Sequence, residues 1–243
     1  MGEDSSGIAS YSAVLIPVHN EAATLAFVLD SVRGHFGGPV LVIDDGSTDS
    51  TSQILSCFEW VDVIRHSNNL GYGKALATAF AWAAEKGLDS VVTMDCDGQH
   101  EPARIPEFLA ELSQGADIIS GSRYLPESVA TGEAPTSRQE INAKVTAVIN
   151  DRTGWSLSDA FCGFKAYRMA SIAGVEWQES GYGFPLELWA RAYARHLSVR
   201  EMPVARIYCD RTRSFGAVLD NPEVRYDYYM RVWNATLSEE GIQ

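Results

Sequence analysis

The first half of the chain alternates between two hydrophobic patterns. Short, almost continuous apolar runs are typical of strands that are buried on both faces. Between them lie stretches with apolar residues at helical spacing. This alternation predicts an α/β domain with a mostly parallel central sheet flanked by helices. Strands are expected near residues 13–18, 40–43, 61–65, 90–94 and 116–120, and helices near 22–32, around 54–55, after 74 and near 103–112.

The second half carries similar patterns less regularly. Residues 124–137 are rich in Pro, Gly, Glu, Ser and Thr, which indicates a mobile loop. No composition shift marks a domain boundary, so we predict a flexible N-terminus (1–10), one domain (11–220) and a C-terminal helix or tail (221–243) packed on it. The remaining elements are expected as helices near 140–152, from 184 and at 223–237, and as strands near 165–168 and 199–204.

Polar clusters follow three of the predicted strands, at residues 17–21, 44–49 and 95–99. Parallel α/β sheets bind ligands at the carboxyl ends of their strands, so these clusters predict one site. Asp95 and Asp97 are separated by one residue and can converge on one point. Two converging carboxylates suit a hard divalent cation, Mg²⁺ or Mn²⁺, whereas an Asp-Gly turn is the alternative interpretation.

Charge and cysteine usage restrict the class of protein. Nineteen Lys and Arg against 32 Asp and Glu give a net charge of −13, which argues against nucleic acid and against electrostatic attraction to anionic lipid. The four cysteines are scattered without zinc spacing, as expected of free thiols in a reducing compartment. Neither a signal peptide nor a bilayer-spanning segment is predicted. We therefore expect a cytoplasmic protein, with at most peripheral contact at the cytoplasmic face of the membrane.

Eight motifs follow one another along the chain, at residues 16–21, 43–49, 69–74, 94–100, 121–124, 159–167, 183–187 and 213–216. Their order and sequences resemble the inverting glycosyltransferases of family 2, which have the GT-A fold. The closest likeness is to the dolichol-phosphate mannose synthase or polyprenyl-phosphate hexosyltransferase branch. One departure is that Gly216 is followed by Ala217 and Val218, where the family usually has a Ser-Lys pair.

The resemblance implies roles on the side of a nucleotide-diphosphate sugar. Asp95, Asp97 and Gln99 correspond to the metal ligands, and Asp95 also to a diphosphate contact. Asp45 is interpreted as the residue that reads the base, with Asp44 bracing the turn. The remaining donor-side candidates are Pro17, His19 and Glu21 in the first nucleotide loop and Lys74 near the phosphates. Arg123 and Arg213 are candidates for phosphate contacts, with Arg211 as the alternative to Arg213.

The resemblance also implies acceptor-side and catalytic residues, for which Asp159, Glu187 and Arg213 are the candidates. A hydroxyl acceptor requires a general base, and Asp159 is the first choice. A lipid phosphate is already anionic and requires no strong base. The sequence leaves this alternative open.

The function expected from the resemblance is metal-dependent, inverting transfer of a hexose from a GDP-mannose or UDP-glucose type donor to a polyprenyl or dolichyl phosphate. A soluble or glycan hydroxyl is the alternative acceptor. A non-catalytic nucleotide-sugar-binding relative is a rival, because the Ser-Lys pair is missing. A sugar-1-phosphate nucleotidyltransferase is disfavoured by the lack of a basic, Gly-rich N-terminal loop. Whether the chain forms homo-oligomers is left open.

Overall fold

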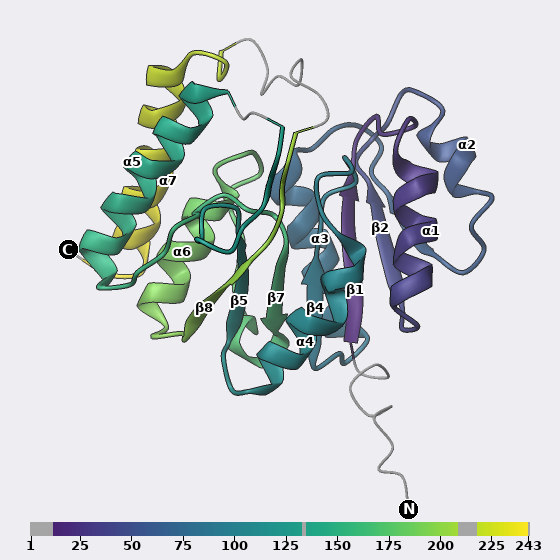
Figure 1. Ribbon diagram of the computed structural model, residues 1–243, viewed down its shortest axis with the longest axis horizontal. Helices are drawn as coiled ribbons and strands as arrows, with labels where there is room; N and C mark the ends of the chain where they lie inside the picture. The colour runs from purple at the N-terminus through teal and green to yellow at the C-terminus, as the bar shows by residue number, and fades with distance from the viewer. Residues whose placement is uncertain (1–11, 133–134, 209–217, 243) are drawn as a thin grey trace, which may run out of the picture.

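A seven-stranded sheet forms the centre of the molecule (Figure 1). The computed structural model describes residues 12–132, 135–208 and 218–242. The strand order is β3-β2-β1-β4-β7-β5-β8, and β7 alone runs antiparallel to its neighbours. The predicted α/β class with a mostly parallel sheet is confirmed. The strands are β1 (Ser12–Val18), β2 (Val40–Asp44), β3 (Asp62–Arg65), β4 (Ser90–Thr93), β5 (Ile118–Ser122), β7 (Lys165–Arg168) and β8 (Val199–Pro203).

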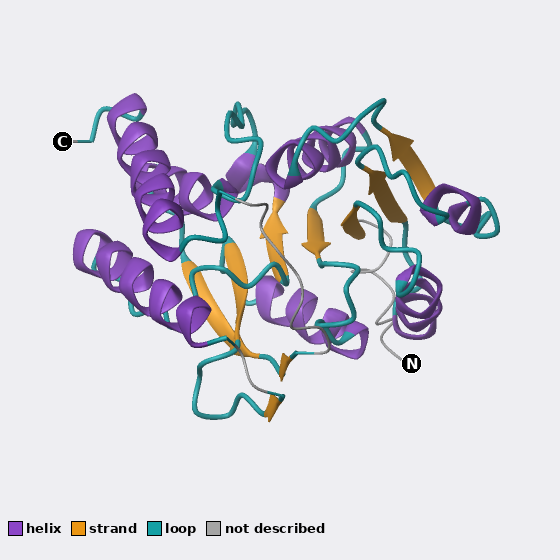
Figure 2. Ribbon diagram, turned by 90° about the horizontal axis from the view of Figure 1, so that it is seen from above, coloured by secondary structure: helices purple, strands orange, loops and turns teal. Residues whose placement is uncertain are grey.

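Helices cover both faces of this sheet (Figure 2). Alternate residues of a strand point to opposite faces, so Leu15 packs in one apolar cluster while Val14 and Ile16 pack in the other. The cluster around Val14 includes α1 (Leu25–His35), α2 (Thr51–Leu55) and α4 (Ile105–Ser113). The cluster around Leu15 includes α3 (Tyr72–Glu85), α5 (Thr136–Thr153), α6 (Phe184–Ala194) and α7 (Pro222–Glu239). Short 3₁₀ turns, η2 (Pro102–Arg104) and η3 (Met169–Ile172), complete the connections.

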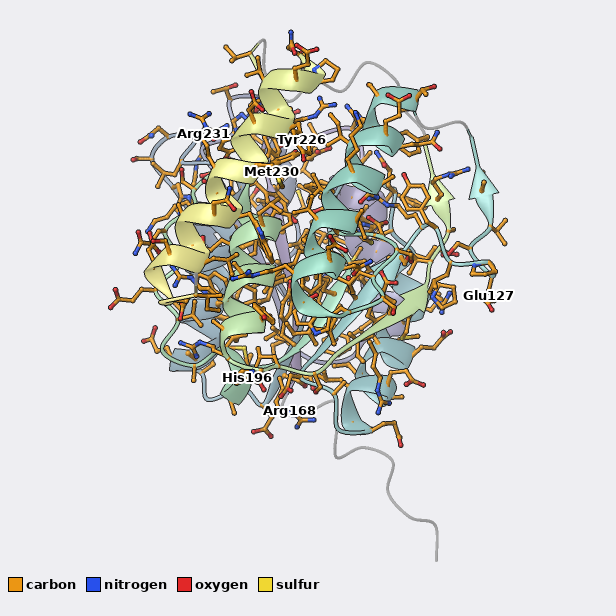
Figure 3. The ribbon with its side chains drawn as sticks, turned by 90° about the vertical axis from the view of Figure 1, so that its left-hand side faces the viewer. Glu127, Arg168, His196, Tyr226, Met230 and Arg231 are labelled. Carbon is orange, nitrogen blue, oxygen red and sulfur yellow. The ribbon has the colours of Figure 1, made fainter. Side chains whose placement is uncertain are left out.

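The helices α5 and α7 lie side by side at one edge of the domain, and α7 also packs on α6. Figure 3 looks onto this face, with Tyr226, Met230 and Arg231 marking α7. Helix α5 begins at Thr136, four residues before the expected start, directly after Pro135. The loop expected over residues 124–137 is pinned by a two-residue parallel bridge between β6 (Ala130–Thr131) and β9 (Arg206–Ile207).

The strand order brings the polar clusters together. β1 pairs with β2 on one side and with β4 on the other, both in parallel register. The segments that follow these three strands therefore share one edge of the sheet. In Figure 1 this is the upper edge, because the chain enters β1 from below. Among the described residues, every helix is too short or too polar to cross a lipid bilayer.

Candidate active site

A cavity of about 820 Å³ opens over this edge of the sheet. Part of its lining comes from the carboxyl end of β1 and the segments after β1, β2 and β4, and part from α5, α6 and α7. The first part includes Pro17, His19, Glu21, Asp45, Asp95, Asp97 and Gln99, so the structure brings these predicted residues into one cavity. The second part includes Arg138, Ile141, Asn142, Leu188, Arg225 and Tyr229.

Asp44 and Asp45, at the end of β2, have different surroundings. The Asp44 carboxylate is fully buried and accepts hydrogen bonds from the Ser47 N–H (2.9 Å) and the Ser52 hydroxyl (2.6 Å). These bonds and the nearby Arg65 hold the pKa of Asp44 below its usual value, although burial raises it. Asp44 thus braces the turn, whereas Asp45 lines the cavity.

The ring of His19 is fixed at both nitrogens. Nδ1 lies 2.8 Å from the carbonyl oxygen of Asp45, which can only accept, so Nδ1 carries a proton. Nε2 lies 3.1 Å from Nδ2 of Asn20. The Asn20 Oδ1 accepts from the Thr48 and Asp49 N–H groups, which assigns its amide and makes Nδ2 the donor to His19. His19 is therefore a neutral, oriented ring at the cavity wall.

Asp95 and Asp97 both line the cavity, with Gln99 beside them. Asp95 receives a hydrogen bond from the Tyr72 hydroxyl (3.1 Å), and its own N–H donates to Nδ1 of His100 (2.9 Å). Burial raises the pKa of the Asp95 carboxyl, as does the charge of Asp97, whereas His100 lowers it. A cation between the two carboxylates would relieve this cost.

The donor set fits a hard divalent ion shared with a substrate. Among the described residues no group of three or more His, Cys, Asp or Glu side chains forms a complete metal cage. Mg²⁺ is usually held by one or two carboxylates plus substrate phosphates and water, so a cage is not required. Asp95, Asp97 and the amide oxygen of Gln99 could supply the protein ligands. Cys96 lies between them in sequence but is buried in the apolar cluster under α4.

Gly163 leaves room for the Asp95 carboxylate. A Cβ atom at position 163 would lie 2.6 Å from Oδ2 of Asp95, so Gly163→Ala must displace that carboxylate. We expect roughly 10- to 100-fold weaker Mn²⁺-dependent nucleotide binding in calorimetry, with the fold retained. Gly34→Ala, where a Cβ meets nothing within 4 Å, is the matched control. Unchanged affinity in Gly163→Ala would contradict the role given to Asp95.

Asp159, the first choice for a general base, lies in a buried ion pair. It is fully buried and is absent from the cavity lining. Its two oxygens accept a bidentate pair from Arg123 (2.7 and 2.9 Å) and further hydrogen bonds from Asn142 (2.9 Å) and the N–H groups of Arg123 and Phe161 (both 3.1 Å). Burial raises the pKa of Asp159, but the Arg123 guanidinium outweighs it and holds that pKa low. The residue anchors Arg123, which does line the cavity.

Glu187 and Lys74, like Asp159, lie outside the cavity lining. Glu187 is buried at the start of α6, where it accepts from the N–H groups of Gln178 (2.9 Å) and Glu179 (2.8 Å) and pairs with Arg191. Its carboxylate holds the loop that contains Gln178 and Glu179, and it does not line the cavity. Lys74 is exposed at the first turn of α3 and is likewise absent from the lining. Arg211 and Arg213 lie outside the described residues.

Several residues that line the cavity were not among the candidates from the sequence. Tyr72 donates to Asp95, and burial and the Asp95 charge raise its pKa, so its hydroxyl stays protonated. Lys165 is a buried lysine that donates to the carbonyl of Cys162. Arg138 and Arg225 reach the cavity from α5 and α7. The sequence signal for Lys165 is its place in the matching motif at residues 159–167, at the start of β7; for the arginines there is none.

Comparison with known proteins decides the family. The sequence model described as Glycosyl transferase family 2 matches residues 13–175. The chain belongs to glycosyltransferase family 2. It is 30% identical over 204 residues to the undecaprenyl-phosphate mannosyltransferase of Micrococcus luteus, covering 78% of this chain and 81% of that protein. It is 29% identical over 216 residues to the polyprenol monophosphomannose synthase of Mycolicibacterium smegmatis, covering 84% and 80%.

The fold is the GT-A fold of this family. The glucosyl-3-phosphoglycerate synthase of Mycobacterium tuberculosis, in a crystal structure with Mn²⁺ and uridine-diphosphate-glucose, superimposes with a TM-score of 0.72. Its sequence is 21% identical, and the match covers 96% of this chain and 80% of that one. At this identity the likeness concerns the fold alone. This family 2 member is a glycosyltransferase.

Proposed function

We propose that this glycosyltransferase transfers a hexose, with inversion and with a divalent metal ion, from a nucleotide-diphosphate sugar to a polyprenyl or dolichyl phosphate. GDP-mannose and UDP-glucose types are the candidate donors. The observation that carries the acceptor assignment is the engagement of Asp159 by Arg123 and Asn142. Because its oxygens are already hydrogen-bonded within the protein, Asp159 is disfavoured as the base that a hydroxyl acceptor would require.

The donor assignment is supported by the part of the cavity next to β1, β2 and β4. Asp45 and the neutral ring of His19 offer a carboxylate and a flat surface to a base. Asp95, Asp97 and Gln99 would hold the metal ion, whose positive charge, when bound, stabilises a departing diphosphate. Mn²⁺ in the structurally similar synthase is consistent with this use.

The acceptor assignment is supported by the arginines of the helical part. Arg138 and Arg225 line the cavity, and the charge of Arg138 contributes to a lowered pKa of Arg225, after burial. Two guanidinium groups that repel each other favour an anion between them. A phosphate monoester supplies that anion and is also the nucleophile. Both of the relatives named above have a polyprenyl phosphate in their name or product.

The reaction is a single displacement at the anomeric carbon. An oxygen of the acceptor phosphate forms the new bond to this carbon while the bond to the diphosphate oxygen breaks and its electron pair leaves with the nucleoside diphosphate. No proton has to be removed from an anionic acceptor. Arg123, held by Asp159, is oriented to stabilise negative charge inside the cavity.

The direct test offers purified protein GDP-mannose or UDP-glucose with Mn²⁺ and a polyprenyl phosphate. The proposal requires release of nucleoside diphosphate together with formation of the polyprenyl phosphosugar. Transfer to a glycan or soluble hydroxyl, with none to the lipid phosphate, would favour the alternative acceptor. The cytoplasmic location and peripheral membrane contact stay predictions.

Arg138→Ala should impair the acceptor step selectively. We expect the KM for polyprenyl phosphate to rise roughly 10-fold, because one hydrogen-bonded charge partner of the phosphate is lost, with donor binding little changed. Steady-state kinetics at varied acceptor concentration measures this effect. Arg152→Ala is the matched control, since Arg152 is exposed near the other end of the same helix. An equal rise in the donor KM would contradict the assignment.

A further inference from the structure

His66 is a partly buried histidine, with 9% of its side chain exposed, at the carboxyl end of β3 and next to the end of β2. Its Nδ1 lies 2.6 Å from Oδ1 of Asp45, and its Nε2 lies 3.0 Å from Oγ1 of Thr78 on α3. Because a carboxylate only accepts, Nδ1 carries a proton in either charge state of the ring. The imidazole is thus held at both nitrogens, between the end of the sheet and a helix.

The hydrogen bonds that the protein donates to the Asp45 carboxylate leave one of its lone-pair sites available. Oδ1 accepts from His66 and from the N–H of Leu70 (2.9 Å), whereas Oδ2 accepts from the N–H of Gly71 (2.8 Å). A carboxylate has about four lone-pair sites, two on each oxygen. The protein fills both sites on Oδ1 and one on Oδ2. The remaining acceptor site belongs to Oδ2 of a residue that lines the cavity.

We propose that His66 is a positioning residue that sets Asp45 to read a single ring N–H on the base of the donor nucleotide. The inference rests on the proposed function, because it presumes that a nucleotide donor occupies the cavity. Uracil and guanine each carry a ring N–H on the edge used for base pairing. The equivalent ring nitrogen of cytosine or adenine is an acceptor, whose lone pair repels a carboxylate oxygen. The site therefore takes uridine or guanosine diphosphates and rejects those of cytidine and adenosine.

His66 donates to Asp45 from a strand of the sheet, whereas the other two donors belong to a loop. The donors Leu70 and Gly71 belong to a segment whose path depends on close backbone packing, since a Cβ at Gly46 would lie 2.3 Å from the carbonyl carbon of Asn68. His66 is the side-chain donor to this carboxylate, and it follows directly from a strand that is hydrogen-bonded to β2. Without it, Oδ1 regains a free lone pair and the carboxylate can accept from a base in more than one geometry. Affinity and base discrimination should then fall together.

Three substitutions of His66 distinguish the effect of losing the hydrogen bond to Asp45 from the effect of losing the volume of the ring. His66→Ala removes the donor. His66→Asn keeps an amide nitrogen at the position of Nδ1 and can still donate to Asp45. His66→Gln carries its amide one bond farther out, closer to the position of Nε2. We expect the asparagine variant to retain most of the function and the other two to lose it.

Calorimetric titration with Mn²⁺ present tests the proposal with five probes: UDP, GDP, CDP, ADP and inorganic pyrophosphate. Wild type should bind UDP or GDP and reject CDP and ADP, and the first two titrations identify the base. His66→Ala should weaken binding of the accepted nucleotide roughly 10- to 100-fold, the usual effect of losing a hydrogen bond to a charged group. Pyrophosphate binding should change less than about twofold, because it depends on Asp95 and Asp97. His35→Ala is the control, since His35 is exposed on α1.

Each of the other outcomes would contradict either the role of His66 or the proposed donor site. Equal loss of nucleotide and pyrophosphate affinity would mean that His66 only supports the fold of the loop. Unchanged nucleotide affinity in His66→Ala, or wild-type binding of CDP or ADP as tight as that of UDP and GDP, would reject the inference and leave the proposed function standing. Failure of wild type to bind any nucleotide or pyrophosphate would reject the proposed donor site itself. If His66→Ala does not fold, Thr78→Val tests the same support through Nε2, with a loss of nucleotide affinity alone expected.

Discussion

Replacing Asp97 by alanine is expected to abolish Mn²⁺-dependent nucleotide binding and to reduce turnover at least about 100-fold, the usual scale for losing an electrostatic contact to a developing charge. The ion would be held by two carboxylates and one amide oxygen of the protein, so removing one carboxylate leaves too little charge to retain it beside a diphosphate. Stability should change by no more than about 1 kcal/mol. The variant loses the hydrogen bond from the Gln99 N–H (3.0 Å) but also relieves repulsion with Asp95.

Titration of UDP and GDP into the variant, each with and without Mn²⁺, measures the effect, and thermal unfolding checks the fold. Glu111→Ala removes an exposed carboxylate on α4 and serves as the control for net charge. If Asp97→Ala binds nucleotide with the same metal dependence as wild type, the metal assignment of the carboxylate pair is wrong.

The position of the site could be predicted from the sequence because it depends on local rules. A polar cluster directly after an apolar run is visible without knowing the fold, and parallel strands bring such clusters to one edge. The sequence therefore points to Asp45 and Asp95 without knowledge of the strand order. It does not predict the antiparallel direction of β7, because a strand of four residues carries no sign of its direction.

The roles of buried charges could not be predicted, because they depend on partners far away in the chain. Asp159 forms an ion pair with Arg123, which is 36 residues away in the chain. Glu187 accepts hydrogen bonds from two backbone N–H groups of a preceding loop. A motif shows that a carboxylate is present but not whether its lone pairs are already used. His66 shows the converse case, since its function follows only from the distance of its ring to Asp45.

The bidentate pair between Arg123 and Asp159 leads to the second large effect. Arg123→Ala should destabilise the protein by roughly 3–5 kcal/mol, because it leaves the charge of a fully buried carboxylate without its counterion. Urea unfolding measures the loss. Asp159→Asn should also be strongly destabilising, and the double variant should lose less than the sum of the two, since the partners are removed together. Strict additivity would show that the pair is not coupled.

The pH dependence of Asp159→Asn distinguishes an anchor from a general base. Arg123 holds the folded pKa of Asp159 below its ordinary value of 3.8, so the pair stabilises the protein at neutral pH and this contribution is lost as pH falls through the lower folded pKa. The stability difference between wild type and Asp159→Asn should therefore shrink only in acid. An anchor changes the height of the profile of kcat/KM against pH but not its shape. A general base would give wild type an ascending limb that disappears in Asp159→Asn, and that result would restore the hydroxyl acceptor as the better assignment.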